Sequence, residues 1–218
     1  MELKSIILII FGVISVIYLI TLGFKPGPFQ FILKGFLMPL VIAIYISNVG
    51  IKNIFPPVLL ALIFAWIGDV LLLKITNLLW FRLGLASFLV GHICYIIAMY
   101  KYINPFNKTI LFISVAAAAC LGIFIYKFVK PSRQMRIPAI AYETVILTMA
   151  IFALQLFLCQ FITNGLIFGL LIFAGSICFI TSDTLLALRT FRKIKMYFAV
   201  MITYIAAQFL ITLGFCMV

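Results

Sequence analysis

Long apolar runs alternate with short polar breaks along the whole chain. The breaks are clusters of charged residues, proline and glycine, and they recur at about the 20-residue interval that a helix needs to cross a bilayer. No run shows the polar alternation of a membrane β-barrel, so the bilayer-spanning segments must be helices. The pattern predicts an all-α integral membrane protein, a bundle of eight transmembrane helices. The expected spans are roughly 5–23, 29–47, 54–73, 78–100, 109–129, 137–159, 165–188 and 196–218.

Short loops join these spans, so consecutive helices should pack as antiparallel neighbours in a single transmembrane domain covering residues 1–218. The first span resembles the start of a signal peptide, but it lacks a clear small-residue cleavage site and runs into the polar stretch 25–28. We expect it to stay as a helix, with signal-peptide removal as the alternative. The second span is the least regular, since Lys34 lies a turn inside it and Pro39 follows.

Composition excludes a soluble protein, because 67% of the residues are hydrophobic and 9% are charged. The mean hydropathy is +1.36, far above that of a soluble domain. A net charge of +12 would suit a nucleic-acid ligand in a soluble protein. In a membrane protein, basic loops are explained by topology and by contact with anionic lipid headgroups. We therefore expect the lipid bilayer, and no nucleic acid, as the partner of these charges.

The basic residues are divided unequally between the two sides of the membrane. Twelve lie on one side: Lys25, Lys34, Lys74, Arg82, Lys127, Lys130, Arg133, Arg136, Arg189, Arg192, Lys193 and Lys195. Four lie on the other side: Lys4, Lys52, Lys101 and Lys108. The positive-inside rule predicts that the first side is cytoplasmic and that both termini are non-cytoplasmic. We expect the cytoplasmic membrane in a bacterium, or the endoplasmic reticulum membrane in a eukaryote.

Several kinds of site are missing from the sequence. The five cysteines all lie in apolar runs and form no CxxC or Cys/His cluster, so we interpret them as packing residues. A single histidine argues against a zinc hydrolase site. There is no nucleophilic serine elbow, HExxH pair or phosphate-binding glycine loop. The sequence therefore predicts neither a metal nor an organic cofactor.

Three of the four acidic residues, Asp69, Glu143 and Asp183, lie inside the apolar spans, and only Glu2 lies outside them. An ionisable group in a bilayer costs a few kcal/mol and is by default a functional hypothesis. Each of the three lies five to seven residues from a basic residue of a predicted cytoplasmic loop. The three carboxyls should therefore share a depth of roughly 8–11 Å, which predicts one polar site open to the cytoplasmic leaflet.

The stretches 68–72 and 182–186 share one pattern: a small residue, then Asp, then a variable residue, then two leucines. Each is followed by a basic loop and a helix that carries a polar group, His92 in one case and Gln208 in the other. This weak repeat suggests two four-helix halves, with Asp69 and Asp183 at matching positions across their interface.

Two carboxyls buried close together disfavour the ionisation of both, so one of the pair should carry a proton. A neutral acid and an ionised base can then work together, whereas the alternative is that each Asp only hydrogen-bonds between helices. Glu143 is either a third chemical group or a counter-ion for Lys34, which can instead reach the headgroups or a lipid phosphate. His92 should lie nearer the membrane centre, with Tyr95 close by on its helix face, as a packed hydrogen-bonding residue.

A set of motifs in this order resembles the YhhN-like lysoplasmalogenase family from about residue 34 to the last helix. The motifs are Lys34-x-x-x-x-Pro39, Gly68-Asp69, His92-x-x-Tyr95, Ser182-Asp183-x-x-Leu186-Ala187 and Tyr204-x-x-x-Gln208-x-Leu210-Ile211. Gly35 stands where many members have a residue such as Pro or Cys, which is a minor departure.

The resemblance implies hydrolysis of the vinyl ether bond of lysoplasmalogens, with a lysophospholipid as substrate, and it matches Asp69 and Asp183 to two essential aspartates. Paired carboxyls suit this chemistry, because one protonates the alkene and the other stabilises the resulting cation and orients water. We expect the site to be lined by six further residues: Lys34, His92, Tyr95, Glu143, Tyr204 and Gln208. Two rival hypotheses are a proton-coupled transporter of a small solute or lipid, which would use the same carboxyls, and an intramembrane aspartyl protease. The sequence lacks the second glycine and the Pro-Ala-Leu signature that an intramembrane aspartyl protease would have.

Overall fold

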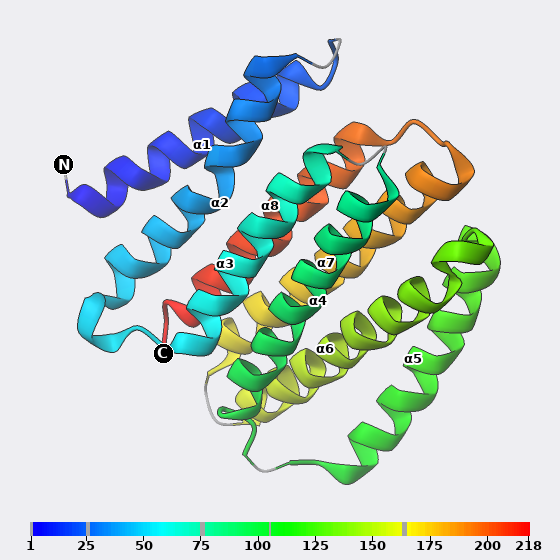
Figure 1. Cartoon of the computed structure of the whole chain (residues 1–218). Coiled ribbons are helices and arrows are strands. Elements are labelled where there is room, and N and C mark those ends of the chain that lie inside the picture. Colours follow the sequence, from blue (N-terminus) through cyan, green and yellow to red (C-terminus); the bar gives the residue numbers. More distant parts are fainter. Residues whose placement is uncertain (1, 25–26, 75–76, 105, 163–164) are drawn as a thin grey trace. The chain divides into compact units, whose positions relative to one another are not determined.

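A computed structural model describes residues 2–24, 27–74, 77–104, 106–162 and 165–218 (Figure 1). The described residues form eight α-helices and no strand, which confirms the predicted fold class. The helices are α1 (Leu3–Thr21), α2 (Pro28–Val49), α3 (Pro56–Leu71), α4 (Leu78–Tyr100), α5 (Lys108–Val129), α6 (Arg136–Ile162), α7 (Leu166–Arg192) and α8 (Tyr197–Phe215). Of the basic residues used to predict the orientation, Lys25 lies outside the described residues.

Seven of the eight helices are long and apolar enough to cross a membrane, and α3 is the exception at 16 residues. Its first two residues are Pro56 and Pro57, which suit the start of a helix because the first turn needs no internal N–H donors. At its other end the chain tightens into the short 3₁₀ turn η2 (Leu72–Lys74). Asp69 consequently lies within the last turn of α3, closer to a helix end than the predicted span 54–73 implied.

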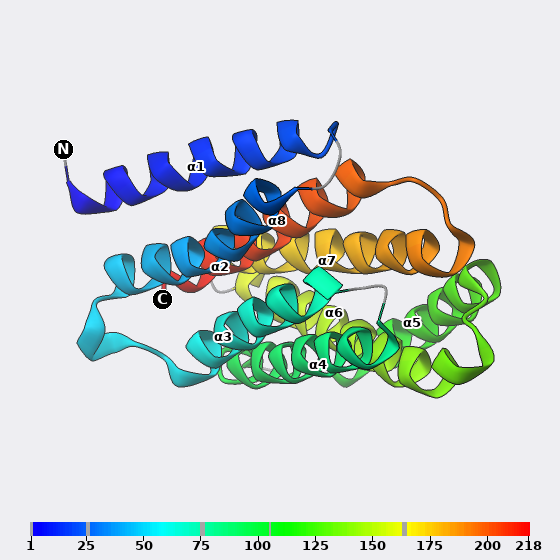
Figure 2. The same cartoon turned by 45° about the horizontal axis from the view of Figure 1, so that its top comes forward.

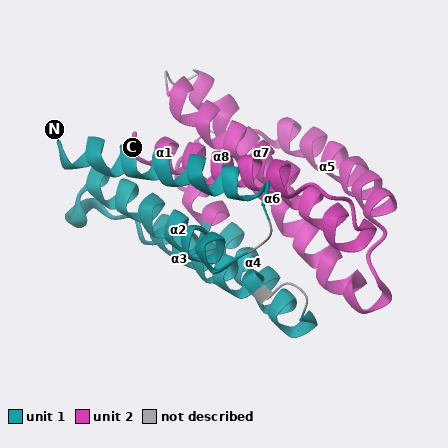
Figure 3. Cartoon of the chain, turned by 90° about the horizontal axis from the view of Figure 1, so that it is seen from above, with its two compact units in different colours: residues 1–94 teal, residues 95–218 magenta. Residues whose placement is uncertain are grey.

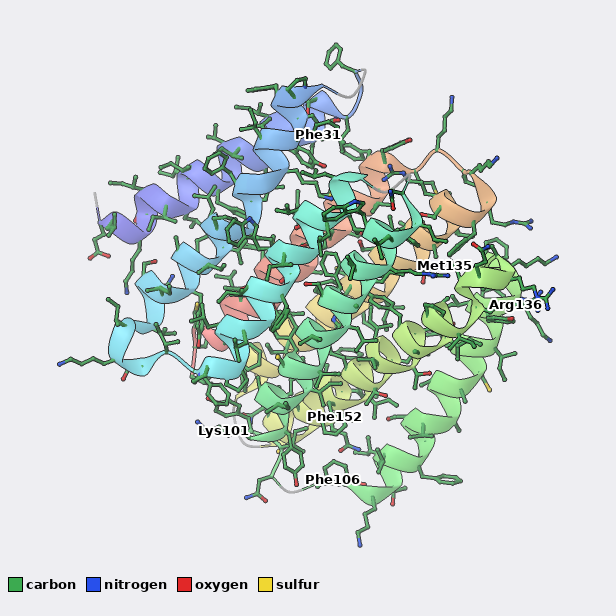
Figure 4. The ribbon with its side chains drawn as sticks, viewed as in Figure 1. Phe31, Lys101, Phe106, Met135, Arg136 and Phe152 are labelled. Carbon is green, nitrogen blue, oxygen red and sulfur yellow. The ribbon has the colours of Figure 1, made fainter. Side chains whose placement is uncertain are left out.

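The chain divides into two compact units, residues 1–94 and 95–218 (Figure 3). Unit 1 holds α1 to α3 and most of α4, and unit 2 holds the end of α4 and α5 to α8. In unit 2, α7 and α8 run side by side along their length (Figure 2). Met135 and Arg136 lie at one end of unit 2, and Lys101 and Phe106 lie at the opposite end (Figure 4). The end with Arg136 is called the basic end below, because most basic loop residues of the unit follow α5 and α7.

The α3–α4 pair of unit 1 and the α7–α8 pair of unit 2 have matching internal contacts. A Cβ placed on Gly91 would lie 3.2 Å from the Ala61 carbonyl oxygen. In unit 2, a Cβ placed on Gly175 would lie 3.0 Å from the Ala207 carbonyl oxygen. The two contacts occupy corresponding positions: Ala61 of α3 corresponds to Gly175 of α7, 114 residues later, and Gly91 of α4 corresponds to Ala207 of α8, 116 residues later.

A second contact follows the same numbering. Gly68 approaches Gly84, since a Cβ on Gly84 would lie 3.4 Å from the Gly68 carbonyl oxygen. The corresponding Ser182 Oγ donates a 3.1 Å hydrogen bond to the Val200 carbonyl. Asp69 and Asp183 are related by the same offset. Each unit therefore builds its aspartate into an equivalent helix pair, which supports the predicted repeat.

The close approach of α7 and α8 can be tested at Gly175. Gly175→Ala places a methyl group 2.6 Å from Ile211 Cγ1 and 3.0 Å from the Ala207 carbonyl oxygen. We expect this overpacking to lower the free energy of unfolding by about 1–3 kcal/mol, measured by denaturation in detergent. The matched control is Gly12→Ala on α1, where no atom lies within 4 Å and the helix should gain up to about 1 kcal/mol. Equal effects at the two positions would contradict the close packing of α7 and α8.

Candidate active site

Asp69 of unit 1 is buried and forms an ion pair with Lys34 of α2. The Lys34 Nζ lies 3.2 Å from the Asp69 Oδ1, and the two side chains are 15% and 4% exposed. Among the alternatives for Lys34, the structure shows pairing with a carboxylate of its own unit. Nearby, Trp66 Nε1 donates a 3.0 Å hydrogen bond to the Gly35 carbonyl. This bond joins α3 to α2 next to the ion pair and holds the two charged residues in register.

The position of Asp69 in the last turn of α3 makes a positive partner necessary. The carbonyl groups at a helix C-terminus carry partial negative charge, which disfavours a carboxylate there. Burial disfavours the same carboxylate because it removes water. The Lys34 ammonium, 3.2 Å from the Asp69 Oδ1, opposes both effects at once.

Asp183 of unit 2 accepts a hydrogen bond from a neutral donor. The Tyr142 hydroxyl on α6 donates a 2.5 Å hydrogen bond to the Asp183 Oδ2 on α7. Tyr142 is 8% exposed. The neighbouring Ser182 fixes α7 against α8 through its bond to Val200, so Asp183 is held from both sides of its helix.

Tyr142 is not among the site residues predicted from the sequence. A usable signal existed: Tyr142 follows Arg136 by six residues, and Asp183 precedes Arg189 by six. Both therefore lie at the same depth from the basic end of unit 2, which makes their contact possible. The hydrogen bond between Tyr142 and Asp183 is therefore consistent with the depths counted from the two basic residues.

Glu143 follows Tyr142 in the sequence but faces another helix. Its Oε1 lies 3.7 Å from a Cβ placed on Gly122 of α5, and the side chain is half-buried. Among the described residues this oxygen has no hydrogen-bond partner. Tyr142 thus points toward α7 while Glu143 points toward α5, and the structure pairs Asp183 with the first of them.

A second group of predicted residues lies deeper in unit 2. The Tyr95 hydroxyl of α4 donates a 2.8 Å hydrogen bond to the Gln208 Oε1 of α8, and both residues are buried. Because Ser182 faces Val200 and Gly175 faces Ala207, Gln208 lies about two helical turns farther from the basic end than Asp183. Two turns correspond to roughly 11 Å.

Tyr204 lies between these two levels of unit 2. Its ring meets that of Phe179 edge-on at a centroid distance of 5.8 Å, and its side chain is 5% exposed. His92 of unit 1 is 1% exposed. Because Gly91 faces Ala61, His92 is about two turns from Asp69 along α3, nearer the middle of the span as the sequence predicted. The roles of all these residues remain predictions.

No group of three His, Cys, Asp or Glu side chains in the described part of the chain is arranged to hold a metal ion. No disulfide joins the five cysteines, all of which lie in the described part of the chain. Cys159 instead donates to the Asn104 carbonyl at 2.8 Å, beside Gln155 and Gln160, whose amides donate to the carbonyls of Asn107 and Tyr102. These side chains of α6 secure the loop at the end of unit 2 opposite the basic end.

The Lys34–Asp69 ion pair predicts a specific pattern of stability changes. Lys34→Met leaves a buried carboxylate without the ammonium, and we expect a loss of about 3–5 kcal/mol in the free energy of unfolding in detergent. Asp69→Asn should also destabilise, because it leaves the ammonium uncompensated. The double variant should be more stable than the sum of the two losses, since both charges are gone. Lys52→Met at an exposed lysine is the matched control, and strictly additive losses would contradict the pair.

Comparison with known proteins identifies a family. Searches against curated proteins and against solved structures gave no match. The family model of the YhhN family matches residues 29–215, which include both aspartates, Lys34, Tyr142 and all helices except α1. The chain belongs to the YhhN family.

Proposed function

We propose that the protein is a membrane-embedded lysoplasmalogenase, which hydrolyses the vinyl ether bond of lysoplasmenylcholine or lysoplasmenylethanolamine. The products are a fatty aldehyde and glycerophosphocholine or glycerophosphoethanolamine. Family membership and the motif resemblance support this activity. The observation that carries the proposal is that two aspartates within the helices have chemically different partners, an ammonium for Asp69 and a phenol for Asp183.

The reaction needs one proton donor and one group that tolerates a cation. Protonation of the β carbon of the vinyl ether leaves an oxocarbenium ion on the carbon bonded to oxygen. Water adds to that carbon and loses a proton, which gives a hemiacetal. The bond from the hemiacetal carbon to the glycerol oxygen then breaks; the hemiacetal hydroxyl loses its proton to become the aldehyde carbonyl, and the glycerol oxygen takes up a proton. No metal or organic cofactor enters these steps.

We assign the two roles from the partners of the aspartates. The Lys34 ammonium lies 3.2 Å from the Asp69 Oδ1, so we assign Asp69 as the carboxylate that stabilises the oxocarbenium ion and orients water. The Tyr142 hydroxyl donates to the Oδ2 of Asp183, so a proton can sit on the other carboxyl oxygen. Asp183 is therefore the group that gives its proton to the β carbon and is reprotonated from the attacking water. This division resembles that of paired carboxylates in glycosidases.

The substrate class follows from the surroundings of the two carboxyls. A lysophospholipid has one chain, so its ether bond can lie below the headgroup region while the chain remains among apolar side chains. Arg189 and Arg192 lie in the last turn of α7, which also carries Asp183. These cations suit a phosphate headgroup at the membrane surface.

A proton-coupled transporter is the second candidate, favoured by the Lys34–Asp69 pair, since intramembrane ion pairs also mark proton relays. It predicts proton-dependent uptake into liposomes without chemical change in the transported molecule. Aldehyde release by the purified protein distinguishes the two candidates directly.

Substitution of either aspartate tests the hydrolase. Asp69→Asn and Asp183→Asn should each lower aldehyde release from lysoplasmenylcholine by about 10²–10⁴-fold, the usual contribution of a positioned acid or base. Glu2→Gln, which changes an exposed acid outside the helices, is the control and should keep full activity. Full activity in both aspartate variants would overturn the mechanism.

Tyr142→Phe tests whether the phenol positions Asp183. A hydrogen bond to a charged or ionisable group contributes about 1.5–3 kcal/mol, so kcat should fall by about 10- to 150-fold with KM nearly unchanged. Tyr100→Phe removes a phenol from an exposed residue of the same unit and should have no effect. A change confined to KM would show that Tyr142 contacts substrate and does not position Asp183.

A further inference from the structure

Helix α8 carries a column of three polar side chains through its apolar length. Tyr204, Gln208 and Thr212 are spaced by four residues, so they lie on one face of the helix. They are 5%, 0% and 0% exposed. A fully buried polar group is normally hydrogen-bonded, because nothing else replaces the water that it loses.

Gln208 uses only part of its hydrogen-bonding capacity. Its Oε1 accepts from the Tyr95 hydroxyl at 2.8 Å, which fixes the amide plane and directs the Nε2 to the other side. Within the described part of the chain, the buried Nε2 has no hydrogen-bond partner. A primary amide carries two N–H donors, so this end of Gln208 calls for an acceptor.

Thr212 differs from other threonines of the same unit. Thr144, Thr148, Thr181, Thr190 and Thr203 each donate to the carbonyl four residues earlier. Such a bond satisfies a threonine hydroxyl within its own helix. The Thr212 Oγ1 is buried and makes no bond of this kind or any other to a described residue. Its hydroxyl is thus available to a group outside its own helix backbone.

The spacing of the two side chains suits one bridging molecule. Residues four apart on a helix have Cβ atoms about 5–6 Å apart. Two hydrogen bonds of about 2.8–2.9 Å, joined at one oxygen, span a similar distance. We propose that Gln208 Nε2 and Thr212 Oγ1 bind one water molecule between them. The Nε2 donates to the water oxygen, and the water exchanges a hydrogen bond with the Thr212 hydroxyl.

Aromatic rings enclose this position toward the end of α8. Tyr95 stacks on Phe215 at a centroid distance of 6.4 Å, and Phe215 also packs against Phe168 at 6.0 Å and Tyr102 at 6.4 Å. Phe215 follows Thr212 by three residues, so these rings lie within about one turn of the position on α8. A water bound there is a fixed part of the unit and holds the Gln208 amide in the orientation that accepts from Tyr95. The site does not depend on the proposed hydrolase activity.

The proposed water is tested by whether Thr212→Val lowers or raises the Tm in detergent. Valine has nearly the shape of threonine but lacks the hydroxyl. If the hydroxyl holds a water, its removal also strands the Gln208 amide, and the Tm in detergent should fall by about 2–4 °C. If the hydroxyl is buried without any partner, its removal relieves a cost and the Tm should stay the same or rise. Thr203→Val is the matched control, because that hydroxyl bonds within its own helix.

Two further measurements complete the test. In a double-mutant cycle, Thr212→Val should cost less in a Gln208→Met background than in the natural chain, since both partners of the water are then lost; additive Tm shifts would overturn the proposal. An experimental map that resolves ordered waters should show a peak within 3.2 Å of both atoms, absent in Thr212→Val. A map without that peak in the natural chain would also overturn it.

Discussion

The cost of keeping a carboxyl group in an apolar surrounding governs this structure. Asp69 is accommodated by the Lys34 ammonium 3.2 Å away, and Asp183 by the Tyr142 hydroxyl at 2.5 Å. Both partners come from a neighbouring helix of the same unit, so each unit provides for its own aspartate. A protein that needed these residues only for helix packing could use amides or serines at lower cost. Two carboxyls with different partners are therefore consistent with the catalytic roles that we propose for them.

Close helix packing makes these pairings possible. The backbone contacts at Gly91 and Gly175 bring α3 against α4 and α7 against α8, and they set the register of each pair. The matching offsets between the two pairs place Asp69 and Asp183 at equivalent points. The units then differ in what surrounds that point, since Gly68 stands where unit 2 has Ser182. One framework used twice thus gives two acids with different electrostatic surroundings, which is what an acid and a base require.

Much of this could be predicted from the sequence, because the strongest signals were long apolar runs and isolated charges. All eight helices and both aspartates follow from those signals. Tyr142 was missed because consecutive helical residues point about 100° apart, and only the packing of α6 shows that Tyr142, and not Glu143, faces α7. The deeper position of Gln208 could have been counted from Lys195, thirteen residues earlier. The short length of α3 could not be predicted, because it depends on the residue at which the 3₁₀ turn η2 begins, and hydropathy does not distinguish an α-helix from a 3₁₀ turn.

The central claim is that Asp69 and Asp183 are the two carboxyls of one acid–base site. The most direct measurement is the distance between their carboxyl carbons in an experimental structure with a non-hydrolysable ether analogue of a lysophospholipid bound. We expect a separation within about 10 Å, with the ether oxygen and its neighbouring carbons between the two groups. A separation well beyond that distance, or an analogue bound away from both aspartates, would contradict it.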